Sequence, residues 1–175
     1  MKITDKELDS ISGRYGSQTP LEDMRVIADL AERVHGGIIL ETGTCGGASA
    51  NTMARASTDS HVFTVDSRRR YIALDDNVTF LEGDSKKVVQ GWDKPIDLLF
   101  IDGGHDYETV KSDFFGFGKY VKNGGIIILH DYGNGRNADV ATFVHDTQDN
   151  PEYKPLGKKA KMIYLYEKCH KSPLS

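Results

Sequence analysis

The chain has 175 residues, of which 38% are hydrophobic and 27% are charged, and its formal net charge is −4. These values favour a single domain over residues 1–175, with an N-terminal helical segment (1–35) and a core (36–168). The net negative charge argues against nucleic-acid binding, which needs a basic surface. No apolar run approaches the roughly 20 residues that span a membrane, and the first residues do not resemble a signal peptide. Because the two cysteines, Cys45 and Cys169, indicate neither a disulfide framework nor a zinc site, we expect a cytoplasmic protein.

Two helices are predicted before the first strand. One covers residues 5–11 and is followed by a loop. The second begins with Thr19 as N-cap and Pro20 at the first helical position, and apolar residues at helical spacing continue it to about Val34.

Strands and helices then alternate along the chain. Apolar runs predict strands over residues 38–40, 61–65, 78–81, 96–101 and 126–129, with helices between them, including one over 107–121, and another over 139–147. Residues 153–156 and 162–166 predict a closing hairpin that turns at Gly157 and Lys158. This succession predicts a three-layer α/β domain with a largely parallel sheet.

Each of the first five predicted strands is followed by an acidic residue. These residues are Glu41, Asp66, Asp84, Asp102 and Asp131. Because the carboxyl ends of parallel strands lie at one edge of the sheet, where ligands of such folds bind, the carboxylates should share a rim. Such a rim suits a ligand rich in hydroxyls or positive charge, or a metal ion. Capping of loops and helices is the structural alternative for each residue.

The turn after the first strand is rich in glycine. Gly43, Gly46 and Gly47 precede a predicted helix, whose free N–H groups favour an anion such as a ligand carboxylate, with the Ser49 hydroxyl as a further donor. The spacing matches neither the dinucleotide-binding fingerprint nor a phosphate loop. Asp66 follows Glu41 at an interval suited to a carboxylate that accepts ribose hydroxyls.

Several motifs occur in order between residues 36 and 132. They are Glu41-x-Gly43-x-x-x-Gly47-x-Ser49, Val65-Asp66, Gly83-Asp84-Ser85, Ile101-Asp102-Gly103-Gly104-His105-Asp106-Tyr107, and Gly124-Gly125 followed by four apolar residues and His130-Asp131. Together they resemble class I S-adenosylmethionine-dependent methyltransferases, most closely the small-molecule O-methyltransferases of the macrocin and catechol type. The resemblance implies a Rossmann-like sandwich whose mostly parallel seven-stranded sheet has an antiparallel C-terminal strand.

The resemblance also assigns roles by position. It implies that the methionine part of S-adenosylmethionine is held by the first acidic residue and the glycine turn, which are Glu41, Gly43, Thr44 and Ser49. The second-strand carboxylate, Asp66, would hold the ribose, and the residues after strand three, Asp84 and Ser85, would border the adenine. The fourth-strand carboxylate, Asp102, would lie near the sulfonium. In cation-dependent relatives the fourth- and fifth-strand carboxylates bind the metal, which points to Asp102 and Asp131, with His130 as a further candidate.

The chain departs from the catechol-type pattern at two positions. Tyr132 stands where those enzymes carry an asparagine, and His105 stands where they carry a catalytic lysine. Two carboxylates with water suit Mg²⁺, whereas an added His105 or His130 would suit Mn²⁺, Zn²⁺ or Fe²⁺. His105 can take a proton near neutral pH and is one catalytic candidate, with helix capping as the alternative. Asp102, which the resemblance places near the sulfonium, is the other.

The resulting hypothesis is transfer of a methyl group from S-adenosylmethionine to a hydroxyl of a small-molecule acceptor, with or without a divalent cation such as Mg²⁺. Two loops are candidates for acceptor recognition: Ser12 to Thr19, and Tyr132 to Asn137 with Arg136. Three alternatives are a metal-dependent hydrolase that uses the Asp and His residues directly, a nicotinamide dehydrogenase, which the glycine spacing disfavours, and a cofactor-binding module without catalysis. We expect no nucleic-acid or membrane partner; monomer and homodimer are both open.

Overall fold

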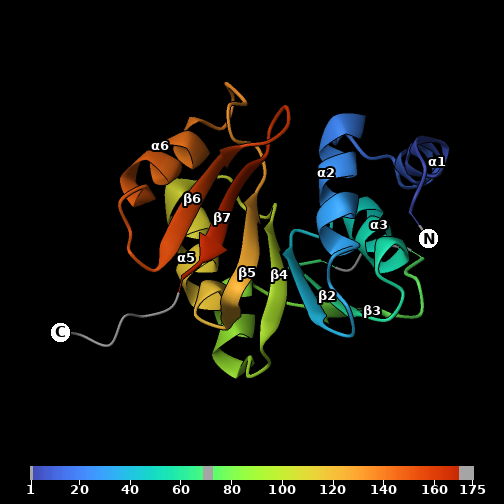
Figure 1. Cartoon of the computed structure of the whole chain (residues 1–175), viewed down its shortest axis with the longest axis horizontal. Coiled ribbons are helices and arrows are strands. Elements are labelled where there is room, and N and C mark those ends of the chain that lie inside the picture. The colour runs from blue at the N-terminus through green and yellow to red at the C-terminus, as the bar shows by residue number, and fades with distance from the viewer. Residues whose placement is uncertain (1, 69–72, 170–175) are drawn as a thin grey trace.

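The protein is built on one seven-stranded sheet, which the computed structural model describes within residues 2–68 and 73–169 (Figure 1). Its strands are β1 (Ile38–Thr42), β2 (His61–Asp66), β3 (Val78–Glu82), β4 (Ile96–Ile101), β5 (Val121–Leu129), β6 (Tyr153–Lys158) and β7 (Tyr164–Lys168), in the order β3-β2-β1-β4-β5-β7-β6. The first five strands are parallel to their neighbours, and β7 is antiparallel to both β5 and β6. The predicted sheet is confirmed.

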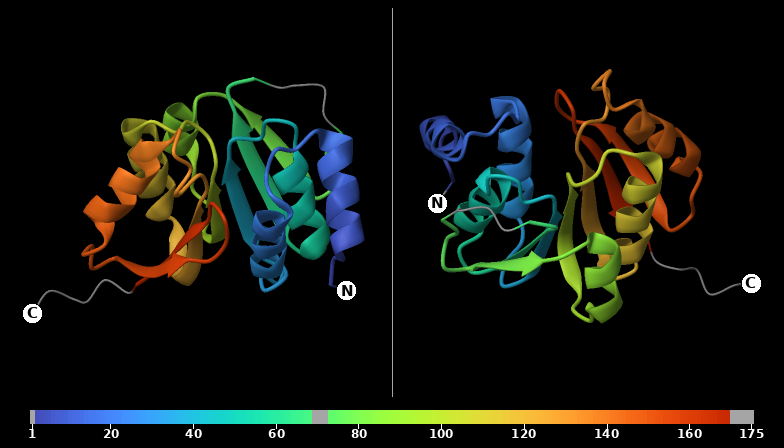
Figure 2. Two further views of the ribbon diagram at one scale, coloured as in Figure 1. Left: turned by 90° about the horizontal axis from the view of Figure 1, so that it is seen from above. Right: turned by 180° about the vertical axis from the view of Figure 1, so that it is seen from behind.

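Helices cover both faces of the sheet (Figure 2). One face carries α1 (Asp5–Tyr15), α2 (Leu21–Ala31) and α3 (Ala48–Ala56); the other carries α4 (Ser85–Val88), the 3-10 turn η1 (Val89–Gly91), α5 (Tyr107–Gly118) and α6 (Ala138–Thr147). Among residues 2–68 and 73–169, no helix combines the length and apolar character that crossing a membrane requires.

The central strands alternate between two hydrophobic cores. Leu98 and Phe100 of β4 pack with the α1–α3 layer, whereas Leu99 and Ile101 pack with the α5–α6 layer. Burial on both faces explains the nearly continuous apolar runs in the sequence.

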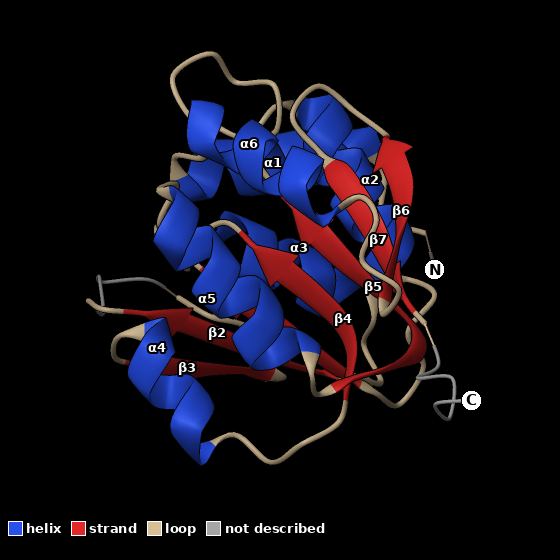
Figure 3. Ribbon diagram, turned by 90° about the vertical axis from the view of Figure 1, so that its left-hand side faces the viewer, coloured by secondary structure: helices blue, strands red, loops and turns tan. Residues whose placement is uncertain are grey.

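The strand order reverses next to β1. From β1 the chain moves outward to β2 and β3, and then returns to place β4 on the other side of β1. Figure 3 shows β2 and β3 on one side of the sheet and β4, β5, β7 and β6 on the other. In open α/β sheets this reversal separates the loops at the carboxyl ends of the two central strands and leaves a crevice for ligands. Asp102, the residue directly after β4, lies at this edge.

Three boundaries of the first two helices differ from the sequence-based prediction, and one of them is the end of α2, which lies at Ala31 and not near Val34. The first helix extends beyond Ile11 to Tyr15, where Gly16 adopts a left-handed conformation (φ 61°) that ends it. Its start is stabilised by a capping box between Thr4 and Glu7. The predicted cap at Thr19 is wrong, because Pro20 occupies the N-cap position of α2 and no side chain caps it.

Two predicted boundaries near the C-terminal half are also wrong. The helix predicted over 107–121 ends at Gly118, and Val121 already pairs with Ile96 as the first residue of β5. The final hairpin does not turn at Gly157 and Lys158; both belong to β6 and pair with β7, so the turn is formed by residues 159–163. The positive φ of Gly157 (86°) coincides with a shift of register in that pair.

Candidate functional site

A cavity of about 560 Å³ opens over the carboxyl ends of β1 to β4. Six of the residues singled out in the sequence line it: Gly43, Asp66, Asp84, Ser85, Asp102 and His105. Its volume falls within the range of about 300–1,000 Å³ that is usual for small-molecule sites. The structure thus brings together residues from four separate strand ends at one cavity.

Gly43 allows the turn after β1 to touch the turn after β4. Its φ is 95°, and a Cβ atom at this position would collide with the backbone carbonyl oxygen of Asp102. The Gly43 N–H donates to the carbonyl of Val65 at 2.8 Å, which also fixes the turn to β2. Glycine is required here both for conformation and for space.

Asp66 anchors the same turn from the end of β2. Its Oδ2 accepts a hydrogen bond from the backbone N–H of Cys45 at 3.0 Å, and its Oδ1 accepts one from the N–H of Arg68 at 3.2 Å. Cys45 has a positive φ of 45°, and the hydrogen bond from its N–H to Asp66 helps to hold this conformation. The Asp66 carboxylate therefore forms part of the cavity wall and also organises the glycine turn.

Glu41, Thr44 and Ser49 lie behind the glycine turn, outside the cavity lining. Glu41 is fully buried and accepts hydrogen bonds from the hydroxyls of Ser49 and Thr64, while the hydroxyls of Thr44 and Thr64 lie 2.6 Å apart. Burial raises the pKa of Glu41 to about 7, although the two hydroxyl hydrogen bonds oppose the rise. This network supports the turn from below.

The residues after β3 also serve a helix start. Asp84 caps α4 by accepting a hydrogen bond from the N–H of Lys86 at 2.9 Å. Asp113 of α5, which the sequence analysis missed, lines the cavity and is 2% exposed, and burial raises its pKa. The sequence does indicate that Asp113 is buried, because it lies three residues after Val110 and four before Phe117 and thus falls on the buried face of α5.

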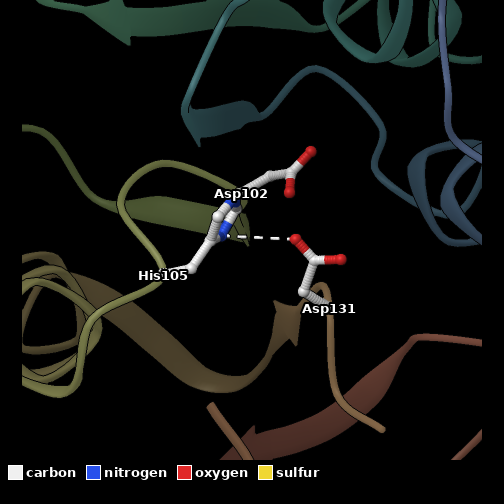
Figure 4. A group of neighbouring side chains, drawn as sticks. All are labelled: Asp102, His105 and Asp131. Carbon is white, nitrogen blue, oxygen red and sulfur yellow. Dashed lines mark ion pairs between the residues drawn. The ribbon is translucent and has the colours of Figure 1, made fainter. Parts of the chain in front are cut away.

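Asp102, His105 and Asp131 form a compact cluster at the ends of β4 and β5 (Figure 4). One ligand atom from each lies within 4.8 Å of the others, and His105 Nδ1 is 3.3 Å from Asp131 Oδ2. Asp131 adopts a left-handed backbone (φ 62°), which aspartate tolerates better than most residues, and its Oδ1 accepts from the Asn134 amide at 2.9 Å. This donor set fits a divalent cation.

His130 lies behind Asp102, and its ring faces two carboxylates. Nδ1 is 2.9 Å from Asp102 Oδ1, and Nε2 is 3.5 Å from Oδ2 of Asp23 on α2. Burial alone would lower the pKa of His130, but the contacts with Asp102 and Asp23 outweigh it and raise the pKa to about 10. His130 thus supports Asp102 from outside the three-residue cluster.

Asp23 was missed by the sequence analysis. It is fully buried although it is charged, and it lies four residues before Ile27 on the packed face of α2. The signal in the sequence is an ionisable residue among the apolar positions of an amphipathic helix.

A second hollow of about 330 Å³ adjoins the first through His105. It is lined by Asp106, Asp139, Ala138 and the loop residues Arg136 and Asn137. One of the two loops predicted to recognise an acceptor therefore lies beside the cluster.

Known proteins match this chain in sequence and in fold. A family model described as "Methyltransferase domain" matches residues 40–132. An uncharacterized protein of Acanthamoeba polyphaga mimivirus is 54% identical over 37 residues, which cover 21% of this chain and only 17% of that protein.

Solved O-methyltransferase structures share the fold. The Bacillus cereus O-methyltransferase in complex with SAH is 21% identical with a TM-score of 0.72, covering 95% of this chain and 92% of that chain. TomG of Streptomyces achromogenes in complex with SAM is 15% identical with a TM-score of 0.75, covering 95% and 89%. MycE in complex with Mg and SAH is 16% identical with a TM-score of 0.68, covering 95% of this chain and 55% of that chain.

Proposed function

Because the chain belongs to the methyltransferase-domain family, we propose that it transfers a methyl group from S-adenosylmethionine to a hydroxyl of a small-molecule acceptor. The observation that carries this proposal is the position of Asp102, which lines the large cavity and also belongs to the Asp102–His105–Asp131 cluster. A cofactor site and a site for proton removal therefore meet at one residue.

The large cavity is proposed as the cofactor site. Asp66 offers its carboxylate to the two ribose hydroxyls, and Asp84 and Ser85 border the adenine. Gly43 lets the turn approach the methionine part closely, while Glu41 and Ser49 support that turn from behind. Relatives of the same fold that bind SAM or SAH support this assignment.

The cluster is proposed to serve the acceptor. S-adenosylmethionine, when bound, supplies an electrophilic methyl group on its sulfonium, so the protein mainly has to align the acceptor and remove its proton. Asp131 faces His105 Nδ1, which orients the ring and leaves Nε2 to take the proton from the acceptor hydroxyl. The adjoining hollow with Arg136 is proposed to receive the rest of the acceptor.

Asp102 and Asp131 are proposed to hold a divalent cation. Two carboxylates beside an imidazole are suitable donors for Mg²⁺ or Mn²⁺, and a cation here would make an acceptor hydroxyl more acidic. MycE, which shares this fold, was solved in complex with both Mg and SAH, and this supports the proposal of a cation in addition to the cofactor.

The proposed location of the protein is the cytoplasm. The free thiols of Cys45 and Cys169 suit a reducing compartment of this kind.

Calorimetric titration with SAH, combined with a labelled-methyl transfer assay on a panel of hydroxylated compounds, tests the proposal. The protein should bind SAH, and Asp66→Ala should weaken binding roughly 10-fold or more because charged hydrogen bonds to the ribose are lost. Asp93→Ala, which removes an exposed carboxylate paired only with Lys94 among the described residues, is the control and should leave SAH affinity unchanged.

The base is tested on the first acceptor that the panel identifies. His105→Ala should reduce kcat by roughly 10²- to 10⁴-fold while SAH affinity stays within a factor of about two. Absence of SAH binding at millimolar concentration would overturn the proposal. Hydrolytic activity that needs only the cation would instead favour the metal-dependent hydrolase that the same cluster could support.

A further inference from the structure

A buried chain of three side chains connects helix α2 with Asp102. The carboxylate of Asp23 is fully buried, the imidazole of His130 is 5% exposed, and the side chain of Asp102 is 19% exposed at the cavity. His130 Nδ1 lies 2.9 Å from Asp102 Oδ1, and His130 Nε2 lies 3.5 Å from Asp23 Oδ2. The charge on Asp23 is thus placed two contacts away from the cluster.

The inner end of this chain has no other partner within the described residues. Asp23 Oδ2 and His130 Nε2 make no hydrogen bond to any other group there, so each is the other's available charged neighbour. Asp23 Oδ1 accepts from the backbone N–H of Met162 at 3.2 Å, which fixes the orientation of the carboxylate. Asp23 is therefore held between the turn after β6 and the imidazole of His130.

Packing alone does not account for a carboxylate at this position. Met24, Ile27 and Ala28 of the same helix bury apolar side chains in the core, and an apolar residue at position 23 would extend that surface. Replacing a buried ionic group with an apolar one is often neutral or stabilising, so the fold itself gains little from the charge. What the charge does provide is a fixed partner for the far side of His130.

We propose that Asp23 is a positioning residue that acts through His130 to hold the Asp102 carboxylate in its working orientation. His130 engages Asp102 Oδ1, which leaves Oδ2 for a ligand in the cavity. Without Asp23 the Nε2 side of the imidazole loses its charged neighbour, so the ring, and with it the Asp102 carboxylate, is held by fewer contacts. This inference rests on the proposed function, because it assumes that Asp102 binds a cation at the cluster.

Outer partners that orient ligating groups typically change metal affinity by 10- to 100-fold when they are removed. Asp23→Asn keeps the shape of the side chain and a carbonyl oxygen for the Met162 N–H, but it removes the charge that faces His130. We therefore expect Asp23→Asn to weaken Mn²⁺ binding by about 10-fold or more. Asp23→Glu restores a carboxylate and should recover part of the affinity, which a purely steric role for position 23 does not predict.

The experiment measures free Mn²⁺ by electron paramagnetic resonance during titration of the full chain, and it measures SAH affinity by calorimetry on the same samples. The matched control is Asp29→Asn on the same helix, whose carboxylate pairs with Lys2 at 3.1 Å and not with the site. Asp29→Asn should bind Mn²⁺ like the unmodified protein. SAH affinity should stay within a factor of about two in each variant and reports correct folding.

The outcomes separate this inference from the proposed function. If the unmodified protein binds both Mn²⁺ and SAH and Asp23→Asn binds Mn²⁺ with unchanged affinity, the inference is overturned while the proposed function stands. If the unmodified protein binds SAH but no Mn²⁺, the cation part of the proposal and this inference both fail. If Asp23→Asn does not fold, the comparison is made with Asp23→Glu and His130→Gln. If both of these variants bind Mn²⁺ with the affinity of the unmodified protein, the inference is overturned.

Discussion

Asp102 is the residue through which the two halves of the site are coupled. Its backbone carbonyl packs against Gly43 of the glycine turn, and its carboxylate contacts His130 and lies near His105 and Asp131. A substitution of Asp102 would therefore disturb both halves at once. Changes at Asp66 on one side and Asp131 on the other are more informative, because each affects one half.

The buried carboxyl of Glu41 makes stability depend on pH. Burial raises its pKa from 4.5 to about 7, against the hydrogen bonds from Ser49 and Thr64. Between these two pH values the folded protein retains a proton that the unfolded chain has released, so the contribution of Glu41 to the free energy of unfolding falls as the pH rises. Above about pH 7 the contribution no longer changes, and the full difference amounts to roughly 3 kcal/mol.

Glu41→Gln removes this titration while keeping the shape of the side chain. Relative to the variant, the unmodified protein should lose about 2 to 3 kcal/mol of unfolding free energy between about pH 5 and about pH 8. Urea denaturation of both proteins across this range measures the difference. Stability curves that stay parallel from acid to neutral pH would show that Glu41 is ionised in the folded protein throughout.

At the scale of secondary structure, the buried strands were predictable and several boundaries were not. The apolar runs and their acidic ends gave the strands β1 to β5 and the rim of the cavity, because a strand buried on both faces has a distinctive composition. The segment around Val121 was assigned to the wrong element, since Lys122, Asn123 and the two glycines that follow carry no strand pattern. Val121 before them and Ile126 after them pair with β4, and the register shifts in between.

The candidate site was predictable only where its residues follow strands. Asp102, His105 and Asp131 lie at strand ends and converge as expected. Asp23 and Asp113 lie on helices, and their contribution depends on how those helices pack, which sequence periodicity does not specify. Glu41 follows the strand-end pattern but turns away from the cavity, because Thr64 and Ser49 offer it hydrogen bonds beneath the turn.

Helix α5 holds the loop that carries His105. Asp106 caps the helix by accepting from the Thr109 N–H at 3.0 Å, and it directly follows His105 in the chain. Asp106→Ala should loosen the loop because the first turn of the helix loses its cap. We expect faster amide hydrogen exchange over residues 103–109 and a melting temperature lowered by a few degrees.

A second cap far from the site provides the control. Thr4 caps α1, and its hydroxyl accepts from the Glu7 N–H at 3.3 Å. Thr4→Ala should lower the melting temperature comparably but accelerate exchange only at the start of α1. Asp106→Asn, which retains a capping oxygen, should behave like the unmodified protein. Equal exchange at residues 103–109 in Asp106→Ala and the unmodified protein would mean that other contacts hold the loop.

At the scale of the whole molecule, the site joins segments that are distant in sequence. α2, the strand ends of β1 to β4, and the left-handed residue Asp131 after β5 all contribute, so the folded arrangement is required to form it. A ligand that binds only this arrangement adds its binding free energy to the stability of the entire fold. Thermal unfolding of the full chain therefore reports occupation of the site.

Cation binding should accordingly raise the melting temperature. At Mn²⁺ concentrations about 100 times the dissociation constant, stabilisation of about 2.7 kcal/mol is expected, or roughly 5–10 °C for a chain of this size. Excess chelator should reverse the shift. Asp131→Asn tolerates the same left-handed backbone, so it should keep the unliganded melting temperature and the SAH-induced shift while losing the Mn²⁺-induced one. An undiminished Mn²⁺ shift in Asp131→Asn would place the cation away from Asp131.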